Sequence, residues 1–231
     1  MPQPLWYHDF ADARKMLGVP NALNVLSNLP FMVVGLFGLV FCLRGKPAAF
    51  LQDEHSAYTT LFLGLFLTGI GSSYYHLAPD NQRLLWDRLP MTVAMAGFIA
   101  LLLVNRIERR IAWVLPLLVA LGTGSALQWS WSERQGNGDL RWYLLYQTLV
   151  MVSGVLLLLM FRGRNEPTKA LVWAVLGNVT AKLFELLDKP IYNCGHLISG
   201  HTLKHLSASL GFIPLLFWFA AQRRQREAHH S

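Results

Sequence analysis

Long apolar runs recur along the whole chain, and they constrain its fold more than any other feature. Each run is about 20 residues long, the length that an α-helix needs to cross the hydrocarbon core of a bilayer. Only 14% of the 231 residues are charged, well below the roughly 25% of an ordinary soluble domain. We therefore predict an all-α, polytopic integral membrane protein, a seven-transmembrane-helix bundle in which residues 1–231 form a single domain. The expected spans are 23–43, 57–76, 86–104, 110–128, 142–161, 168–187 and 203–221.

The basic residues predict how these helices are oriented. With the N-terminus outside, 11 of the 20 Lys and Arg residues fall on the cytoplasmic side and 7 on the outer side. The positive-inside rule then favours an N-out, C-in topology. This distribution accounts for the net charge of +7 without a nucleic-acid partner. The sequence points to no protein partner.

The two ends of the chain are expected to lie outside the membrane. Residues 1–22 form an N-terminal extramembrane segment that lacks the pattern of a signal peptide. Residues 222–231 form a basic C-terminal tail, which we expect to anchor the chain to anionic membrane lipids. The short connections suggest a multi-pass protein of a bacterial inner membrane.

The cysteines and the charges inside the helices give further expectations. Cys42 and Cys194 should lie at opposite sides of the membrane and not meet, which excludes a disulfide framework and a cysteine-rich zinc module. Lys182 and Glu185 are three residues apart and should neutralise each other within one helix. Asp188, at the outer end of that helix, should be solvated.

Three histidines predict a metal site at the outer ends of two helices. His201 and His205 are four residues apart at the start of the last span, so on a helix they face the same way and can bind one metal ion. His76 ends the second span, on the same outer side in the predicted topology. Three histidines leave a fourth position for water, which is typical of a catalytic zinc. A fourth candidate, His196, is more consistent with an exposed loop residue.

Ser72 and Asp87 are the candidate catalytic residues near this site. Ser72 lies four residues before His76 on the same helical face, where its hydroxyl can donate a hydrogen bond to an oxyanion. Asp87 enters the next helix, where a carboxylate can take a proton from a metal-activated water and pass it to a leaving amine. The alternatives are that Ser72 only packs between helices and that Asp87 pairs with Arg83 or Arg88.

The pattern Ser72-x-x-x-His76, then Asp87, then His201-x-x-x-His205 resembles the motifs of the alkaline ceramidases. These are seven-helix membrane amidases in a superfamily that includes the adiponectin and progestin receptors. The resemblance implies that His76, His201 and His205 bind zinc, that Ser72 stabilises the oxyanion and that Asp87 handles protons. The implied substrate is ceramide or a similar lipid amide, cleaved to a fatty acid and a sphingoid-type amine.

The resemblance also implies a calcium site just before the first span. Asp9, Asp12 and Asn21 are the counterparts of the calcium ligands, and the run Asn24–Asn28 is also similar to the family. Two features depart from the pattern, because Arg14 stands about where another oxygen ligand is expected and Asn21 is neutral where a carboxylate is usual. Calcium prefers about six to eight oxygens, so an occupied site and a weakened or absent one both stay open.

Two non-enzymatic functions compete with hydrolysis. In a receptor or scaffold, zinc would staple the second, third and seventh helices, so that zinc loss would unfold the bundle while Asp87→Asn would leave function intact. A proton-coupled transporter would use Asp87 and Glu185, but the chain shows no paired broken helices or repeats. A zinc-dependent membrane hydrolase is the predicted function.

Overall fold

The computed structural model describes residues 1–44, 54–163 and 167–230, with side chains described as far as Ala221. Within these residues the chain is helical apart from turns and one isolated β-bridge between Met16 and Val19. The predicted all-α class is confirmed. Lys46, Arg164 and the side chains of the basic tail, which supported the topology prediction, lie outside the described part.

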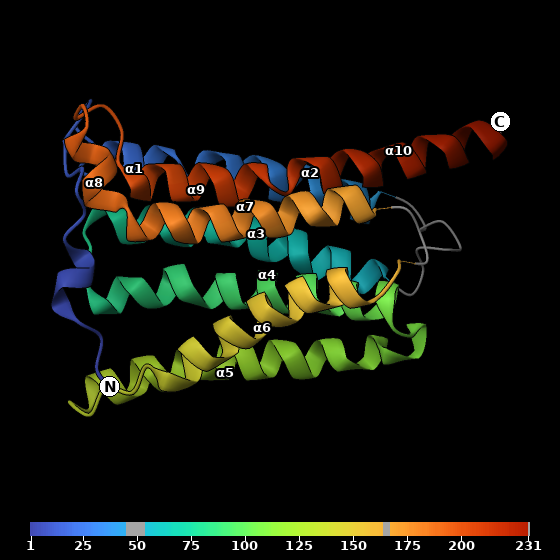
Figure 1. Cartoon of the computed structure of the whole chain (residues 1–231), viewed down its shortest axis with the longest axis horizontal. Coiled ribbons are helices and arrows are strands. Elements are labelled where there is room, and N and C mark those ends of the chain that lie inside the picture. The colour runs from blue at the N-terminus through green and yellow to red at the C-terminus, as the bar shows by residue number, and fades with distance from the viewer. Residues whose placement is uncertain (45–53, 164–166, 231) are drawn as a thin grey trace.

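The long helices run side by side along the longest dimension of the molecule (Figure 1). In chain order the elements are η1 (Leu5–His8), α1 (Ala22–Leu26), α2 (Leu29–Leu43), α3 (His55–Leu77), α4 (Asn81–Arg106), η3 (Arg109–Trp113), α5 (Val114–Arg134), α6 (Arg141–Met160), α7 (Thr168–Leu186), α8 (Asp188–Asn193), α9 (Gly200–Leu210) and α10 (Ile213–His230).

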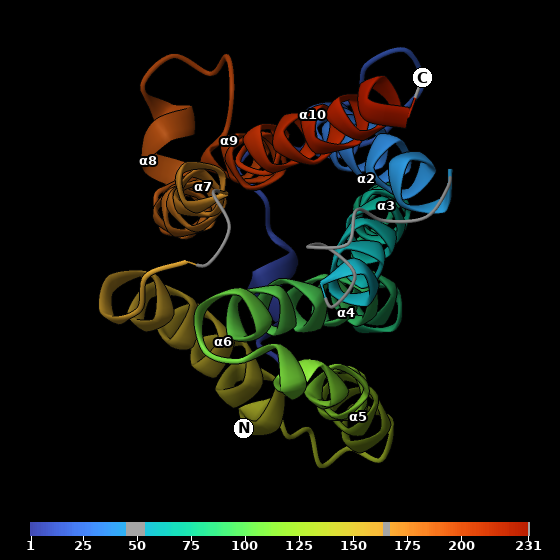
Figure 2. The same ribbon diagram turned by 90° about the vertical axis from the view of Figure 1, so that its right-hand side faces the viewer.

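The helices are arranged as a ring around a shared interior (Figure 2). Going round the ring, α2 contacts α3, α3 contacts α4, α4 contacts α6, α6 contacts α7, α7 contacts α9, and α9 returns to α2. Helix α10 continues beyond α9 beside α2 and α7, whereas α5 packs against α4 and α6 from outside. The ring thus brings α3 and α9, which carry the candidate metal ligands, to the same interior.

Within the part of the chain that the structure describes, five helical segments are long and apolar enough to cross a membrane: Ala22–Leu43, Asn81–Arg106, Arg109–Arg134, Arg141–Met160 and Gly200–Ala221. They indicate a membrane protein. Helices α3 and α7 occupy the second and sixth expected spans but are not among these five, and α7 carries two lysines and a glutamate. The count of seven spans and the N-out, C-in orientation therefore stay predictions.

Several helix boundaries differ from those expected. Helix α4 begins earlier, at Asn81, because the Asp80 carboxylate caps it by accepting a hydrogen bond of 2.7 Å from the backbone N–H of Arg83. The helix expected over 110–128 starts later and continues to Arg134. The first expected span is divided into α1 and α2, and the last into α9 and α10.

The N-terminal segment 1–22 packs across one end of the bundle (Figure 1). The side-chain oxygen of Gln3 accepts a hydrogen bond of 2.6 Å from Arg88 of α4. The backbone N–H of Ala11 donates to Asp188 of α8 at 3.0 Å. The segment therefore joins helices from opposite sides of the ring and covers its end.

Helices α3 and α4 approach closely at Gly71. A Cβ atom at this position would lie 1.9 Å from the backbone oxygen of Trp86, so the approach requires glycine. Gly71 directly precedes Ser72, and Trp86 directly precedes Asp87. The contact between the two backbones therefore brings the two candidate catalytic residues together.

The main hydrophobic core lies among α2, α3, α4 and α10. Tyr58, Leu61, Phe62, Leu101 and Leu215 are fully buried there. A smaller cluster around Trp129 packs near the N-terminal segment. Cys42 is buried, Cys194 is exposed and both are free thiols, which confirms that they do not pair.

Candidate metal centre

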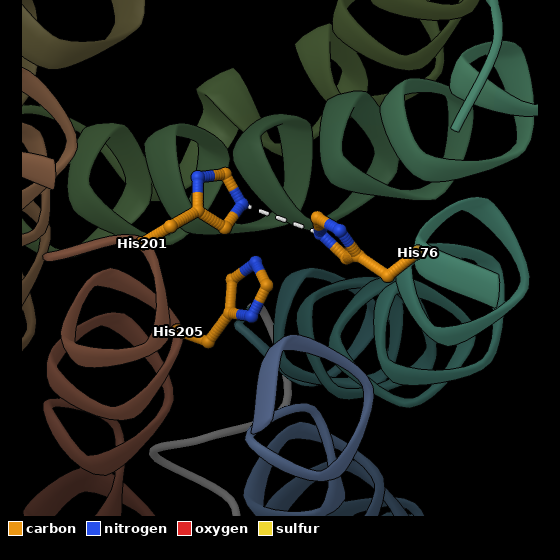
Figure 3. Close-up of side chains that lie close together, drawn as sticks. All are labelled: His76, His201 and His205. Atoms are coloured by element: carbon orange, nitrogen blue, oxygen red, sulfur yellow. Dashed lines mark hydrogen bonds between the residues drawn. The ribbon is translucent and has the colours of Figure 1, made fainter. Parts of the chain in front are cut away.

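Three histidines from two helices meet in one buried cluster (Figure 3). His76 lies in the last turn of α3, and His201 and His205 lie one turn apart near the start of α9. One ligand nitrogen of each residue lies within 4.8 Å of the others, and each side chain is at most 5% exposed. The structure thus brings together the residues that the sequence selects, and their binding of zinc stays a prediction.

The hydrogen bonds of His205 select the form of imidazole that binds metals. Its Nδ1 lies 2.8 Å from the Ser27 hydroxyl, which itself donates to the backbone oxygen of Asn24 at 3.1 Å. Because the single Ser27 proton is used in that bond, the hydroxyl accepts the proton of Nδ1. Nε2 of His205 is then left with a free lone pair.

His76 and His201 face each other across the cluster. Their Nε2 atoms are 3.3 Å apart (Figure 3), a separation at which one nitrogen donates to the other or both lone pairs converge on a cation. Nδ1 of His76 is buried and has no hydrogen-bond partner among the described residues. Three buried imidazoles in mutual contact are a donor set that fits Zn²⁺.

Two residues that sequence reasoning missed complete the surroundings of the cluster. The ring of Phe10 packs on His76 and His201, with centroid distances of 4.6 and 4.4 Å. The Asp188 carboxylate accepts a hydrogen bond of 2.7 Å from the backbone N–H of His201 and one of 3.0 Å from that of Ala11. Asp188 is only partly buried, but beyond the expected solvation it links α9 to the N-terminal segment.

Ser72 and Asp87 lie beside the histidine cluster. They are 1% and 8% exposed, they directly follow the two residues whose backbones meet at the Gly71–Trp86 contact, and both line the same cavity as His205. Arg83, a possible partner of Asp87, instead pairs with Asp80 at 3.8 Å. Ser72 and Asp87 are thus within reach of one another at the wall of the cavity.

Arg88, the other possible partner of Asp87, is held by different groups. Its guanidinium donates to Gln3 and lies over the rings of Trp129 and Tyr143, at 4.2 and 4.7 Å from their centroids. These contacts are cation–π interactions. Among the described residues, no ion pair involves Asp87.

The cavity inside the ring has a volume of about 380 Å³. Its polar wall includes Ser72, Asp87 and His205, and the N-terminal segment contributes Trp6 and Tyr7. The rest of the lining is mainly apolar and includes Phe31, Leu65, Phe98, Val150 and Phe212. A cavity whose surface is mostly apolar but also carries polar side chains suits a lipid whose polar group must be positioned.

The expected ion pair between Lys182 and Glu185 is present in α7. Glu185 also binds Lys204 of α9, at 2.6 Å, a contact that spacing along one helix does not predict. All three residues line the cavity. The charge of Glu185 is therefore compensated from two helices.

The expected calcium ligands are engaged in other contacts. Both carboxylate oxygens of Asp12 bind Arg14, at 2.8 Å to Nε and 2.7 Å to Nη2. The side-chain N–H of Asn21 donates to the backbone oxygen of His76 at 2.9 Å, and Asp9 is exposed. Because a guanidinium already neutralises Asp12, these residues as arranged do not fit a calcium ion.

His196 lies apart from the histidine cluster. It is exposed, its backbone has a positive φ of 53°, and its ring packs edge-on against Tyr192 at 4.9 Å. The described geometry therefore agrees with the expectation of a loop residue.

The fold and the site together define a helical membrane protein with a buried three-histidine cluster beside a serine and an aspartate that line a mostly apolar cavity. A protein-family model described as Ceramidase matches residues 18–231, so the chain belongs to the ceramidase family. The resemblance noted from the sequence motifs is confirmed. The family indicates a hydrolase with a lipid substrate. Comparison with curated proteins gives no match.

Proposed function

We propose that the chain is a zinc-dependent membrane amidase. It hydrolyses the N-acyl bond of ceramide or a similar lipid amide to a fatty acid and a sphingoid-type amine. The observation that carries this proposal is that Ser72, Asp87 and His205 all line one mostly apolar cavity, with His76 and His201 in contact with His205.

His76, His201 and His205 would hold the zinc ion. Bound zinc supplies a Lewis acid and makes hydroxide available near neutral pH. Asp87 accepts a proton from the attacking water and delivers it to the amide nitrogen. Ser72 donates a hydrogen bond to the oxygen of the tetrahedral intermediate. The water oxygen forms the new C–O bond first, and the C–N bond breaks when the tetrahedral intermediate collapses with its nitrogen protonated, so one water is consumed for each fatty acid and amine released.

The family of the chain and its apolar helices support a place in the membrane. We propose a multi-pass protein of a bacterial inner membrane, with residues 1–22 and the histidine cluster toward the outer side. The packing of the N-terminal segment next to the cluster supports the placement of both on one side. A cysteine-accessibility experiment with Cys194, which is exposed, checks that side, since an impermeant thiol reagent should label it in intact cells.

The test of the proposed activity is hydrolysis of a fluorescent N-acyl sphingosine by the detergent-purified chain, with zinc quantified in parallel. We expect about one zinc per chain and measurable cleavage. His205→Ala should lose both zinc and activity. Asp87→Asn should keep zinc and lower kcat by about 100-fold or more.

Asp80→Asn is the matched control for Asp87→Asn. Asp80 starts the same helix and acts as its cap, a role that asparagine also fills, so turnover should stay near that of the wild type. A chain that binds zinc but cleaves none of a broad panel of N-acyl lipids would contradict the amidase and favour the zinc-stapled scaffold.

A further inference from the structure

Arg14 connects two distant parts of the chain at the end of the bundle. Its Nη2 donates to the Asp12 carboxylate and also to the backbone oxygen of Leu197, at 2.8 Å. Leu197 lies in the turn between α8 and α9, just before His201. The guanidinium thus ties the N-terminal segment to the turn that leads into the metal cluster.

A second set of hydrogen bonds runs parallel to this connection. The backbone oxygen of Asp12 accepts a hydrogen bond of 3.2 Å from the side-chain amide of Asn24. The amide oxygen of Asn24 accepts one of 2.9 Å from the hydroxyl of Thr202, the residue after His201. Asp12 is therefore linked to α9 through its backbone, while its carboxylate is linked to the preceding turn through Arg14.

The burial of Asp12 explains why a cation is needed here. Its side chain is only 2% exposed, and a buried carboxylate is costly unless it is paired. Arg14 supplies the charge with two parallel hydrogen bonds, the strong geometry for a guanidinium and a carboxylate. The Arg14 hydrogen bonds also lower the pKa of Asp12 from its ordinary value.

We propose that Arg14 is a built-in cation that takes the place of calcium in this chain. It fixes residues 11–14 on the turn before α9 and so positions His201, and the zinc site needs no calcium to form. Arg14 is a positioning residue, because it reaches the metal cluster only through the chain. This inference rests on the proposed zinc site but not on the amidase activity, since Tm and zinc retention test it and hydrolysis does not.

The chain contains a matched control for Arg14. Asp139 and Arg141 are also two residues apart, and Nε and Nη2 of Arg141 donate hydrogen bonds of 2.8 and 2.9 Å to the two carboxylate oxygens of Asp139. Among the described hydrogen bonds and ion pairs, Arg141 binds only Asp139, and its side chain is 74% exposed. Replacing Arg141 therefore removes an Asp–Arg pair of the same geometry, but it breaks no hydrogen bond from the arginine to a distant segment.

The experiment compares the full-length wild type, Arg14→Asn and Arg141→Asn in detergent, with either about 1 mM Ca²⁺ or a calcium-selective chelator. We measure Tm and the rate of zinc loss to a chromogenic chelator. The wild type and Arg141→Asn should behave alike under both conditions. Arg14→Asn should lose zinc about 10–100-fold faster, and Ca²⁺ should slow that loss, because asparagine and the freed Asp12 carboxylate offer oxygen ligands.

Three results would overturn the inference. One is a wild-type chain that Ca²⁺ stabilises, and another is an Arg14→Asn variant that retains zinc as the wild type does. The third is zinc loss from Arg14→Asn that is equally fast with and without Ca²⁺. If Arg14→Asn does not fold, Arg14→Lys keeps the charge without the paired hydrogen bonds. It should lose zinc faster than the wild type, and an unchanged rate would count against Arg14.

Discussion

Replacing Gly71 with alanine tests whether the close approach of α3 and α4 brings together Ser72 and Asp87, the proposed catalytic residues. The added Cβ would lie 1.9 Å from the Trp86 backbone oxygen, whereas ordinary contact begins at 3.4 Å, so the two helices must separate locally by about 1.5 Å. A backbone oxygen cannot rotate away as a side chain can. We expect a loss of about 1–3 kcal/mol in the free energy of unfolding. Because Ser72 and Asp87 would move apart, turnover should fall about 100-fold.

Gly124→Ala in α5 is the control, because its Cβ would meet no atom within 4 Å. The same exchange there should be neutral or stabilise the helix by up to about 1 kcal/mol. The assays are thermal unfolding in detergent and hydrolysis of the fluorescent lipid amide. For a chain of this length the Gly71→Ala variant should unfold about 2–12 °C lower. Wild-type Tm and wild-type turnover in Gly71→Ala would refute the reasoning.

Three further predictions concern the metal and the charges. Ser27→Ala removes the acceptor of the His205 Nδ1 proton and should weaken zinc binding about 10–100-fold in a chelator competition; unchanged affinity would show that the hydroxyl does not orient the imidazole. A chain with free zinc present at 100 times its Kd should have an unfolding free energy about 2.7 kcal/mol higher than the zinc-free chain. A Tm that does not depend on zinc would contradict zinc binding to the folded chain. Arg14 lowers the pKa of Asp12 in the folded chain, so the ionised Asp12–Arg14 pair stabilises the fold. This stabilisation is complete above pH 3.8, the ordinary pKa of the carboxyl, and disappears as the pH falls through the lowered pKa. Lowering the pH below 3.8 should therefore reduce the free energy of unfolding more in the wild type than in Arg14→Asn. An equal dependence of that free energy on pH in both proteins would contradict the pairing.

The sequence predicts the features that depend on local geometry. Apolar runs of bilayer length indicate the helices, since every backbone hydrogen bond of a helix is made within its own segment. The spacing of His201 and His205 places both imidazoles on one face of α9, and the structure shows them in contact. The order of the expected spans also brings the end of α3 to the start of α9, where His76 meets them.

The contacts between distant segments could not be predicted from one sequence. Asp188 binds the backbone of His201 and of Ala11, but no spacing rule relates an aspartate to residues in separate segments. Phe10 packs on the cluster from a segment that lies well before the first span. Lys204 likewise pairs with Glu185 of a different helix. Such pairings depend on how the helices of the ring pack against one another, and hydrophobic periodicity does not predict that packing.

Each histidine of the cluster is held by a different distant segment, and this would link the proposed zinc binding to assembly of the ring. Ser27 binds Nδ1 of His205, Asn21 binds the backbone oxygen of His76, and Asp188 binds the backbone N–H of His201. None of these groups is a ligand, yet each fixes the position from which a ligand acts. The cluster therefore exists only when the N-terminal segment, α1, α3, α8 and α9 are all in place. Because the proposed zinc ion would bind only the assembled arrangement, its binding free energy would contribute to the folding of the whole end of the bundle.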